Sequence, residues 1–365
     1  MNFMQEIFSA NSFPVSLKLT IAIPTRNRYG SFKKVVDEVC WRILEAGAIS
    51  EIQLIIVDDY TSGIETENHV KYLMKEYGFV SYYRCEDGLG LDKTVLRCLE
   101  LAVTKYVWII NDHSSMPEGV LSRILKYLQD EFIYIFAPDS GNLKHAFRTY
   151  AISKTGLGFI NTLINTSIFN KEMLLPYFKY HLAEYDGSWL VFQVANLDMI
   201  FDNQNLDILL LPFECSLYGK YMDAERQKTS WNSNWDSYVT IGYQGAKILA
   251  YIKNKHNLSD SFYKEIFNNR EWGLAACNAY MRLRKTGKRK AEEIANVISG
   301  HPTYNYIERK IITKAITTGD KALLFYEVIL LVYGIFYGKF YDHSIKQVIR
   351  QKLSHIYRNI ILRIF

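Results

Sequence analysis

The chain has 365 residues, of which 49% are hydrophobic and 22% are charged. These values are typical of a globular protein with one large domain plus an appendage, or with two ordinary domains, and they exclude a disordered chain. The formal net charge of +5 is too small to indicate nucleic-acid binding, so we expect no nucleic-acid partner.

The cysteines indicate neither a disulfide framework nor a zinc site. They are odd in number and none has Cys-x-x-Cys spacing: Cys40, Cys85, Cys98, Cys215 and Cys277. Free thiols of this kind fit a reducing compartment. The N-terminal stretch MNFMQEIFSANSF also lacks the basic and apolar regions of a signal peptide. We therefore expect a cytoplasmic protein.

Short apolar strands alternate with helical segments after an N-terminal extension of residues 1–16. Strands are predicted at Leu19–Ile23, Ile52–Val57, Val80–Tyr83 and Tyr106–Ile110. Helices are predicted between them, at residues 30–47, 65–77 and 91–103. This alternation predicts an α/β fold with a mostly parallel, Rossmann-like sheet and helices on both faces. Its ligand crevice is expected beyond the carboxyl ends of the strands.

The second half of the chain has a less regular pattern. A strand at Phe132–Phe136, a helix from about Ser188 and a strand at Leu206–Leu211 are predicted to complete a first domain, residues 17–215. Strand patterns end near Tyr218, and helical spacing of apolar residues continues beyond it. We therefore predict an all-helical C-terminal region, residues 216–365.

Polar clusters stand at three of the predicted strand ends: Thr25–Arg28, Asp58-Asp59 and Asn111–His113. Crowded carboxylates are costly unless a positive group lies among them, and a divalent cation held by Asp112 is one solution. Two structural alternatives are open. Asp112 would cap a helix that begins near Pro117, with Asn111 and His113 as turn residues, and Asp58-Asp59 would form an Asx turn.

The clusters lie in the segments IAIPTRNR, LIIVDDYTSG and LGLDKTVLRCLELAVTKYVWIINDHSSMPEGVL. Their order and spacing resemble the N-terminal half of family 2 nucleotide-sugar glycosyltransferases, which have the GT-A fold, and in particular those that build bacterial surface polysaccharides. The resemblance covers residues 17–125 well and 126–215 loosely. It implies a hexosyltransferase-like, inverting enzyme with a nucleotide-sugar donor. The implied acceptor is a glycan or lipid-linked glycan, as in O-antigen or capsule synthesis.

The resemblance also implies roles for individual residues. The donor-binding set comprises Pro24, Thr25, Arg28, Asp58, Asp59, Lys93, Asn111 and Asp112. Within it, Asp58 or Asp59 would accept hydrogen bonds from the base or the ribose. Lys93 would face the diphosphate, although a solvated helix face is the alternative for this side chain.

The segment Asn111-Asp112-His113 departs from the family, whose members carry an acidic triplet at this place. The replacement removes up to two negative charges, so we expect weaker metal binding than is usual in the family. The metal ligands would be Asp112 and His113, for Mn²⁺ or Mg²⁺, and the imidazole favours Mn²⁺. Metal-independent catalysis is also open.

An inverting transferase needs a general base that takes the proton of the acceptor hydroxyl. In relatives this base follows the metal triplet by several tens of residues, where HLAEYDGSWLVFQVANL stands in this chain. Asp186 is the first candidate and Glu184 the second, and the alternative for Asp186 is a helix cap. Trp189 would stack on the acceptor sugar, with burial as a packing residue the alternative.

The C-terminal residues 344–365 form a predicted basic amphipathic helix. Such a helix binds anionic membrane surfaces or packs within a helical region, and both interpretations are open. The first would place the protein peripherally on the inner face of the cell membrane. Two other functions are kept as alternatives, namely a nucleotidyltransferase and a non-catalytic binding or scaffold subunit.

Overall fold

The computed structural model describes residues 4–8, 16–128, 133–138, 167–203, 208–213, 244, 247–261, 306, 310 and 313. The chain forms two compact units, Met1–Asn268 and Asn269–Phe365. All helices and strands discussed below belong to the first unit. The predicted domain boundary at residue 215 and the predicted basic helix at 344–365 lie outside the described residues.

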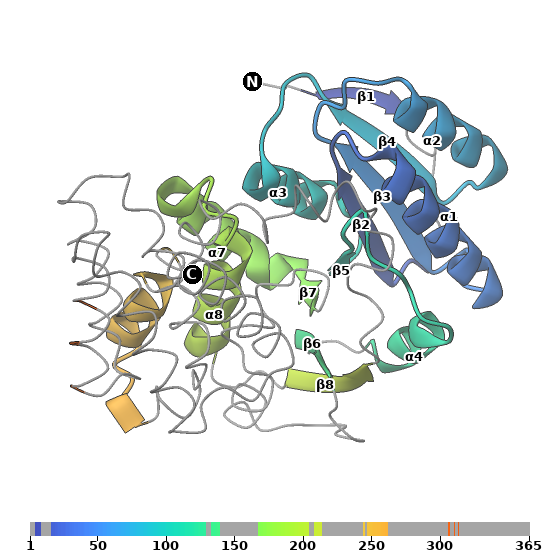
Figure 1. Cartoon of the computed structure of the whole chain (residues 1–365). Helices are drawn as coiled ribbons and strands as arrows, with labels where there is room; N and C mark the ends of the chain where they lie inside the picture. The colour runs from blue at the N-terminus through green and yellow to red at the C-terminus, as the bar shows by residue number, and fades with distance from the viewer. Residues whose placement is uncertain are drawn as a thin grey trace, which may run out of the picture. The chain divides into compact units, whose positions relative to one another are not determined.

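The first half of the chain folds as the predicted alternation of strands and helices. Its elements are β2 (Leu19–Thr25), α1 (Tyr29–Glu45), β3 (Ile52–Asp58), α2 (Glu65–Glu76), β4 (Val80–Cys85), α3 (Leu91–Leu101), β5 (Tyr106–Ile109) and α4 (Val120–Tyr127). Strands β2, β3, β4 and β5 run parallel to one another. Helices α1 and α2 lie side by side over one face of the sheet, whereas α3 lies over the other (Figure 1).

The order of the strands explains where a ligand crevice belongs. The sheet has the order β1-β4-β3-β2-β5-β7-β6-β8, so β2 lies between β3 and β5. The chain leaves β2 toward β3 and β4, and then crosses back to β5 on the other side. The loops after β2 and β5 therefore meet at a topological switch point, where open α/β sheets bind their ligands.

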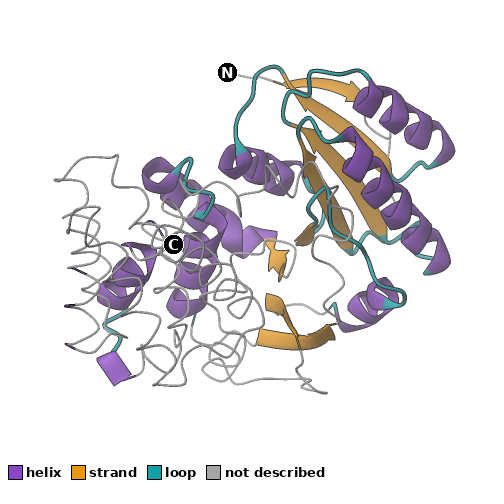
Figure 2. Ribbon diagram, in the orientation of Figure 1, coloured by secondary structure: helices purple, strands orange, loops and turns teal. Residues whose placement is uncertain are grey.

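The second half extends the sheet beyond β5 with both antiparallel and parallel strand pairs (Figure 2). Its elements are β6 (Ile133–Pro138), β7 (Ser167–Asn170), α7 (Lys171–Tyr185), α8 (Val191–Asp202) and β8 (Ile208–Phe213). Strand β7 pairs antiparallel with both β5 and β6, and β1 (Met4–Phe8) pairs antiparallel with β4. Sequence analysis predicted β6 and β8 with shifted bounds, but it did not predict β1, β7 or α7.

The core forms because the central strands are mostly apolar and buried along their whole length. Every residue of β2 and β3 is buried, as expected for parallel strands that are covered on both faces. Helix α1 packs one face against them through residues at helical spacing: Phe32, Val35, Val36, Val39 and Ile43. Trp108 of β5 is also fully buried. This packing fixes the carboxyl ends of β2, β3 and β5 relative to one another.

Two further findings concern the thiols and the membrane. Cys40, Cys85 and Cys98 are free and buried, and burial raises the pKa of the Cys85 thiol to about 11. Among the helices in the described ranges, none has the length and apolar character that crossing a membrane requires.

Candidate active site at the switch point

Backbone pairing brings the three predicted clusters together. Thr25 at the end of β2 is the register partner of Asp58 at the end of β3. The Asp59 N–H donates to the Thr25 carbonyl at 2.8 Å, and the Ile110 N–H donates to the Ala22 carbonyl at 2.8 Å. The loops that follow β2, β3 and β5 therefore start at one edge of the sheet.

Asp112 is the centre of a buried polar group at this edge. Its carboxylate accepts a hydrogen bond from the Thr25 hydroxyl at 3.0 Å and one from the Arg28 guanidinium at 2.7 Å. His113 Nδ1 lies 3.1 Å from the same oxygen as Arg28. Asp112 is 1% exposed, whereas the Arg28 side chain is 38% exposed, so Arg28 also faces solvent. Asp112 does not cap α4, whose N-cap is Gly119.

Two other members of the predicted donor set have backbone roles. Pro24 is buried within β2 opposite Val57. The Asn111 carbonyl accepts a hydrogen bond from the Ser114 N–H at 3.1 Å, so Asn111 begins the turn after β5. The structure thus places Thr25, Arg28, Asp112 and His113 in direct contact, and it places Pro24 and Asn111 beside them.

Asp58 supports the fold of the loop after β3. Its two oxygens accept hydrogen bonds from the Thr61 N–H at 2.8 Å and from the Tyr82 hydroxyl at 2.7 Å. Burial and the neighbouring Asp58 carboxylate raise the pKa of Tyr82 well above its ordinary value. The turn-forming interpretation therefore holds for Asp58.

Asp59 links the end of β3 to the loop before α3. It accepts hydrogen bonds from the Leu89 N–H and, at 3.2 Å, from the Gly90 N–H. The Arg26 guanidinium lies 3.3 Å from the Asp59 carboxylate. A Cβ atom at Gly88 would lie only 2.7 Å from Arg26 Nη2, so a glycine at this position leaves room for the arginine. Sequence analysis did not single out Arg26.

The predicted bases lie at the end of α7, and one of them contacts α3. Lys93 Nζ lies 2.7 Å from the Asp186 carboxylate, and both side chains are partly exposed. Glu184 hydrogen-bonds to Tyr185 and, after burial, contributes to the raised pKa of that phenol. Asp186 is the C-cap of α7, while α8 has Leu190 as its N-cap. The alternative that Asp186 caps the following helix is therefore wrong.

Trp189 belongs to the same loop as Asp186. Its side chain is 40% exposed, and its backbone has a φ of +65°. Left-handed backbone is rare for a large side chain, so the surrounding contacts must hold this conformation. The exposed ring fits acceptor contact better than complete burial does.

A second polar cluster, which sequence analysis missed, joins three helical segments. Asp198 of α8 is 1% exposed, and it accepts hydrogen bonds at 2.8 Å from His181 of α7, from Lys255 and from His256. These bonds outweigh the effect of burial and hold the pKa of Asp198 well below its ordinary value. No sequence motif predicts this cluster, because its members are far apart in the sequence.

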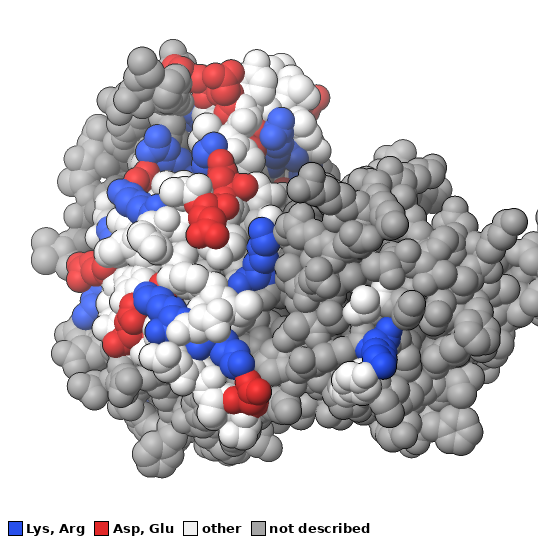
Figure 3. Space-filling view, turned by 90° about the vertical axis from the view of Figure 1, so that its left-hand side faces the viewer, with Lys and Arg blue, Asp and Glu red and all other residues white. Residues whose placement is uncertain are grey.

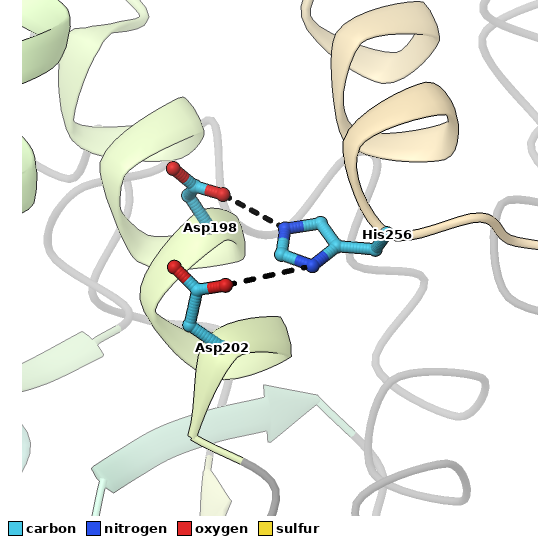
Figure 4. Close-up of side chains that lie close together, drawn as sticks. All are labelled: Asp198, Asp202 and His256. Carbon is cyan, nitrogen blue, oxygen red and sulfur yellow. Dashed lines mark hydrogen bonds and ion pairs between the residues drawn. The ribbon is translucent and has the colours of Figure 1, made fainter.

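The same cluster contains a group that could hold a metal ion. Potential ligand atoms of Asp198, Asp202 and His256 lie within 4.8 Å of one another. Figure 4 shows both carboxylates on one helix directed toward the imidazole. However, Lys255 Nζ lies 2.8 Å from each Asp198 oxygen and 3.0 Å from Asp202. Because the ammonium group already supplies a positive charge, the cluster does not depend on an ion.

The described part of one face carries charges of both signs (Figure 3). Figure 3 shows one face on which Lys and Arg side chains are interspersed with Asp and Glu side chains. This mixture gives the described part of that face no extended field of one sign. Recognition of a charged ligand therefore depends on local groups, such as Arg28.

Comparisons with known proteins give a family match and similar folds. Residues 20–192 match the model of the family described as glycosyl transferase family 2. A crystal structure of S. aureus TarS 1-349 is 13% identical, covers 89% of this chain and 93% of its own, and has a TM-score of 0.58. The mannosyltransferase PcManGT from Pyrobaculum calidifontis, solved with GDP-Man and Mn²⁺, is also 13% identical, with 88% of each chain covered and a TM-score of 0.48. No curated protein sequence matches the chain.

The matched range contains the whole switch point, from β2 through α3 and β5 to the loop of Asp186 and Trp189. The predicted α/β fold is confirmed by the likeness to the TarS structure. Residues 20–192 therefore match the glycosyl transferase family 2 model on a GT-A-like fold, and these findings support a glycosyltransferase.

Proposed function

We propose that the protein transfers a sugar from a nucleotide-diphosphate sugar to a hydroxyl group of a glycan, with inversion at the anomeric carbon. The observation that carries this proposal is the Arg28–Asp112 ion pair at the switch point, at 2.7 Å. The pair fixes a half-exposed guanidinium where an open α/β sheet binds its ligand. A guanidinium is suited to the diphosphate because it donates several hydrogen bonds in a planar fork.

The donor is held from two sides of the switch point. Arg28 binds the diphosphate and stabilises the negative charge that develops on it as the sugar leaves. His113, next to Asp112, is a second donor to a phosphate oxygen. On the other side, Asp59 and the half-exposed Arg26 recognise the nucleoside. Asp59 retains acceptor capacity because each carboxylate oxygen has two lone pairs.

The described donor set does not favour strong metal binding at Asp112. A divalent cation at this carboxylate would compete with the guanidinium of Arg28, which already lies 2.7 Å from Oδ1. His113 is the other predicted ligand, and it too contacts Oδ1. We therefore assign the fixed positive charge of the site to Arg28. Mn²⁺ or Mg²⁺ is then an accessory to the reaction, and no step is assigned to it.

Asp186 is the general base in this proposal. Its partly exposed carboxylate takes the proton from the acceptor hydroxyl while that oxygen attacks the anomeric carbon. Lys93 orients the carboxylate through the ion pair at 2.7 Å. Glu184 is the weaker candidate, because it is bound to Tyr185 and not to α3. Trp189 offers an exposed ring on which the acceptor sugar stacks.

A role in bacterial surface polysaccharide synthesis, such as O-antigen or capsule, completes the proposal. The acceptor would be a lipid-linked glycan, and the protein would work at the cytoplasmic face of the membrane. Support comes from the basic amphipathic pattern of residues 344–365, which is suited to an anionic surface. Co-sedimentation of the full chain with vesicles containing phosphatidylglycerol tests this point, and absence of binding at low salt contradicts it.

Release of nucleoside diphosphate from a panel of UDP- and GDP-sugars tests the enzymatic proposal, with water as the acceptor. We expect one donor to be hydrolysed slowly and Asp186→Asn to lower that rate by about 100-fold or more. Glu184→Gln is the matched control, and it should retain the rate. If Glu184→Gln is inactive while Asp186→Asn is active, the base is Glu184 and the assignment of Asp186 is wrong.

A further inference from the structure

Asp92 is a buried carboxylate that the proposed mechanism does not use. It lies in the first turn of α3 and is 2% exposed, whereas Lys93 beside it is 46% exposed. A buried aspartate needs hydrogen-bond donors to remain ionised. The first turn of a helix supplies part of this stabilisation, because its N–H groups are positively polarised.

The donors to Asp92 come from the loop that joins α7 to α8. The Trp189 N–H donates to one carboxylate oxygen at 2.9 Å, and the Val191 N–H approaches the other at 3.4 Å. Trp189 is the residue whose φ of +65° is rare for a large side chain. Asp92 therefore holds the loop at the point where its backbone conformation is least favourable.

Lys93 holds the same loop at its other end. Its ammonium group lies 2.7 Å from Asp186, which directly follows α7. Two consecutive residues of α3 thus contact both ends of the segment 186–191. Helix α3 is itself fixed to the switch point, because Asp59 binds the N–H groups of Leu89 and Gly90 immediately before it.

We propose that Asp92 is a positioning residue for sugar transfer: through the N–H groups of Trp189 and Val191, its carboxylate holds segment 186–191 so that Asp186 and Trp189 face the acceptor. This inference rests on the proposed function for the role of Asp186. It goes beyond that proposal because it names the group that connects the acceptor side of the site to the donor side. Asp92 touches neither substrate nor reacting atoms, so its effect is indirect.

The protonation state of Asp92 supports this role. Burial raises the pKa of Asp92 to about 6, the N–H groups of Trp189, Val191 and Gly187 oppose that rise, and the charge of Asp186 adds to it. Lys93 and Asp186 are the charged groups of the described residues that lie beside it. A protonated acid is a weaker acceptor than a carboxylate, so the hydrogen bonds from these N–H groups weaken as pH falls through about 6.

The test compares wild-type protein with Asp92→Asn by amide hydrogen exchange and by nucleoside diphosphate release. The asparagine is nearly isosteric, but its NH₂ group cannot accept a hydrogen bond. In Asp92→Asn we expect amide exchange in segment 186–191 to accelerate about ten-fold, which corresponds to the loss of one hydrogen bond. Peptides from β2 to β5 should exchange as in wild type. The rate kcat of nucleoside diphosphate release should fall, with the Kd of the nucleoside diphosphate unchanged.

Wild-type protein provides a second measurement that needs no variant. After correction for intrinsic exchange, the rate in segment 186–191 should differ between pH 5 and pH 7.5, and Asp92→Asn should show no such difference. Unchanged exchange in the variant, or unchanged kcat despite faster exchange, overturns the proposal. Failure of the proposed function is seen separately, as an Asp186→Asn variant that releases nucleoside diphosphate at the wild-type rate.

Discussion

Individual carboxylates in this protein have different roles although several stand in similar sequence contexts. Asp58 and Asp59 are neighbours, yet Asp58 supports the turn after β3 and Asp59 anchors the loop before α3. Their spacing in the sequence does not distinguish them, because both follow the same apolar strand. The distinction comes from Tyr82 on β4 and Gly90 before α3, which are brought there by the sheet.

Asp92 should make the stability of the protein depend on pH. Its pKa rises on folding from an ordinary value of 3.8 to about 6, so the folded state binds more protons than the unfolded state between these values. Stability therefore falls as pH rises through this window, by about 3 kcal/mol in total. The Asp92→Asn variant lacks this component. We expect it to gain stability relative to wild type as pH rises from 4 to 7, by an amount on that order.

Urea denaturation at a series of pH values measures this difference. A constant difference in the free energy of unfolding between Asp92→Asn and wild type across the window would show that Asp92 does not titrate there. The expected result, a less active variant whose stability relative to wild type improves toward pH 7, is typical of a residue retained for function at a cost in stability.

The Arg28–Asp112 ion pair predicts a weak dependence on metal. Because the guanidinium already neutralises the carboxylate, nucleoside diphosphate release in EDTA should remain within about ten-fold of the rate with Mn²⁺, a difference of about 1.4 kcal/mol in the barrier. Activity that is abolished by EDTA and restored by Mn²⁺ would show instead that a cation displaces Arg28 from Asp112.

At the scale of elements, the first half of the sheet was predictable and much of the second half was not. Strands β2 and β3 are mostly apolar, and α1 has apolar residues at helical spacing. Helix α7 also has buried residues at helical spacing, but two of the four are His181 and Tyr185. Pro176 also lies inside this helix. From sequence alone, a polar residue at a core position is assigned to the surface unless its partner is known. The partner of His181 is Asp198, which lies on another helix.

Asp198 should contribute strongly to the docking of residues 247–255 onto α7 and α8. Replacing it with asparagine leaves the positive charge of Lys255 and the imidazoles without their common partner, so we expect Asp198→Asn to lower the free energy of unfolding by about 2–4 kcal/mol at pH 7. Asp202→Asn is the matched control on the same helix. Because Asp202 is 36% exposed, its loss should cost less than about 1 kcal/mol.

The contribution of Asp198 to the free energy of unfolding depends on pH with the opposite sign to the contribution of Asp92. The pKa of Asp198 falls on folding from 3.8, so its contribution is complete above that pH and is lost as pH falls below it. Chemical denaturation at pH 7 and at pH 3.5 measures the size of the Asp198→Asn effect and its dependence on pH. Equal effects of Asp198→Asn and Asp202→Asn at pH 7 would mean that the buried network does not hold these helices together.

At the scale of the whole molecule, one line of contacts connects the proposed donor and acceptor sides. It runs from Asp112 through Thr25 to Asp59, and from the loop before α3 to Asp186. The order of motifs along the chain predicted that their loops converge. It could not predict Asp92 as the link to segment 186–191, because the two are about a hundred residues apart and neither carries a motif that names the other.

Arg28, which is held by Asp112, is proposed to bind the diphosphate of the donor. Titration of UDP and GDP into the protein in EDTA, followed by calorimetry, tests this claim most directly. We predict that Arg28→Met raises the Kd of the nucleotide that binds by about ten-fold or more, at least about 1.4 kcal/mol, while Arg123→Met, an exposed arginine on α4, binds as wild type does. Equal affinity of Arg28→Met and wild type would contradict the account.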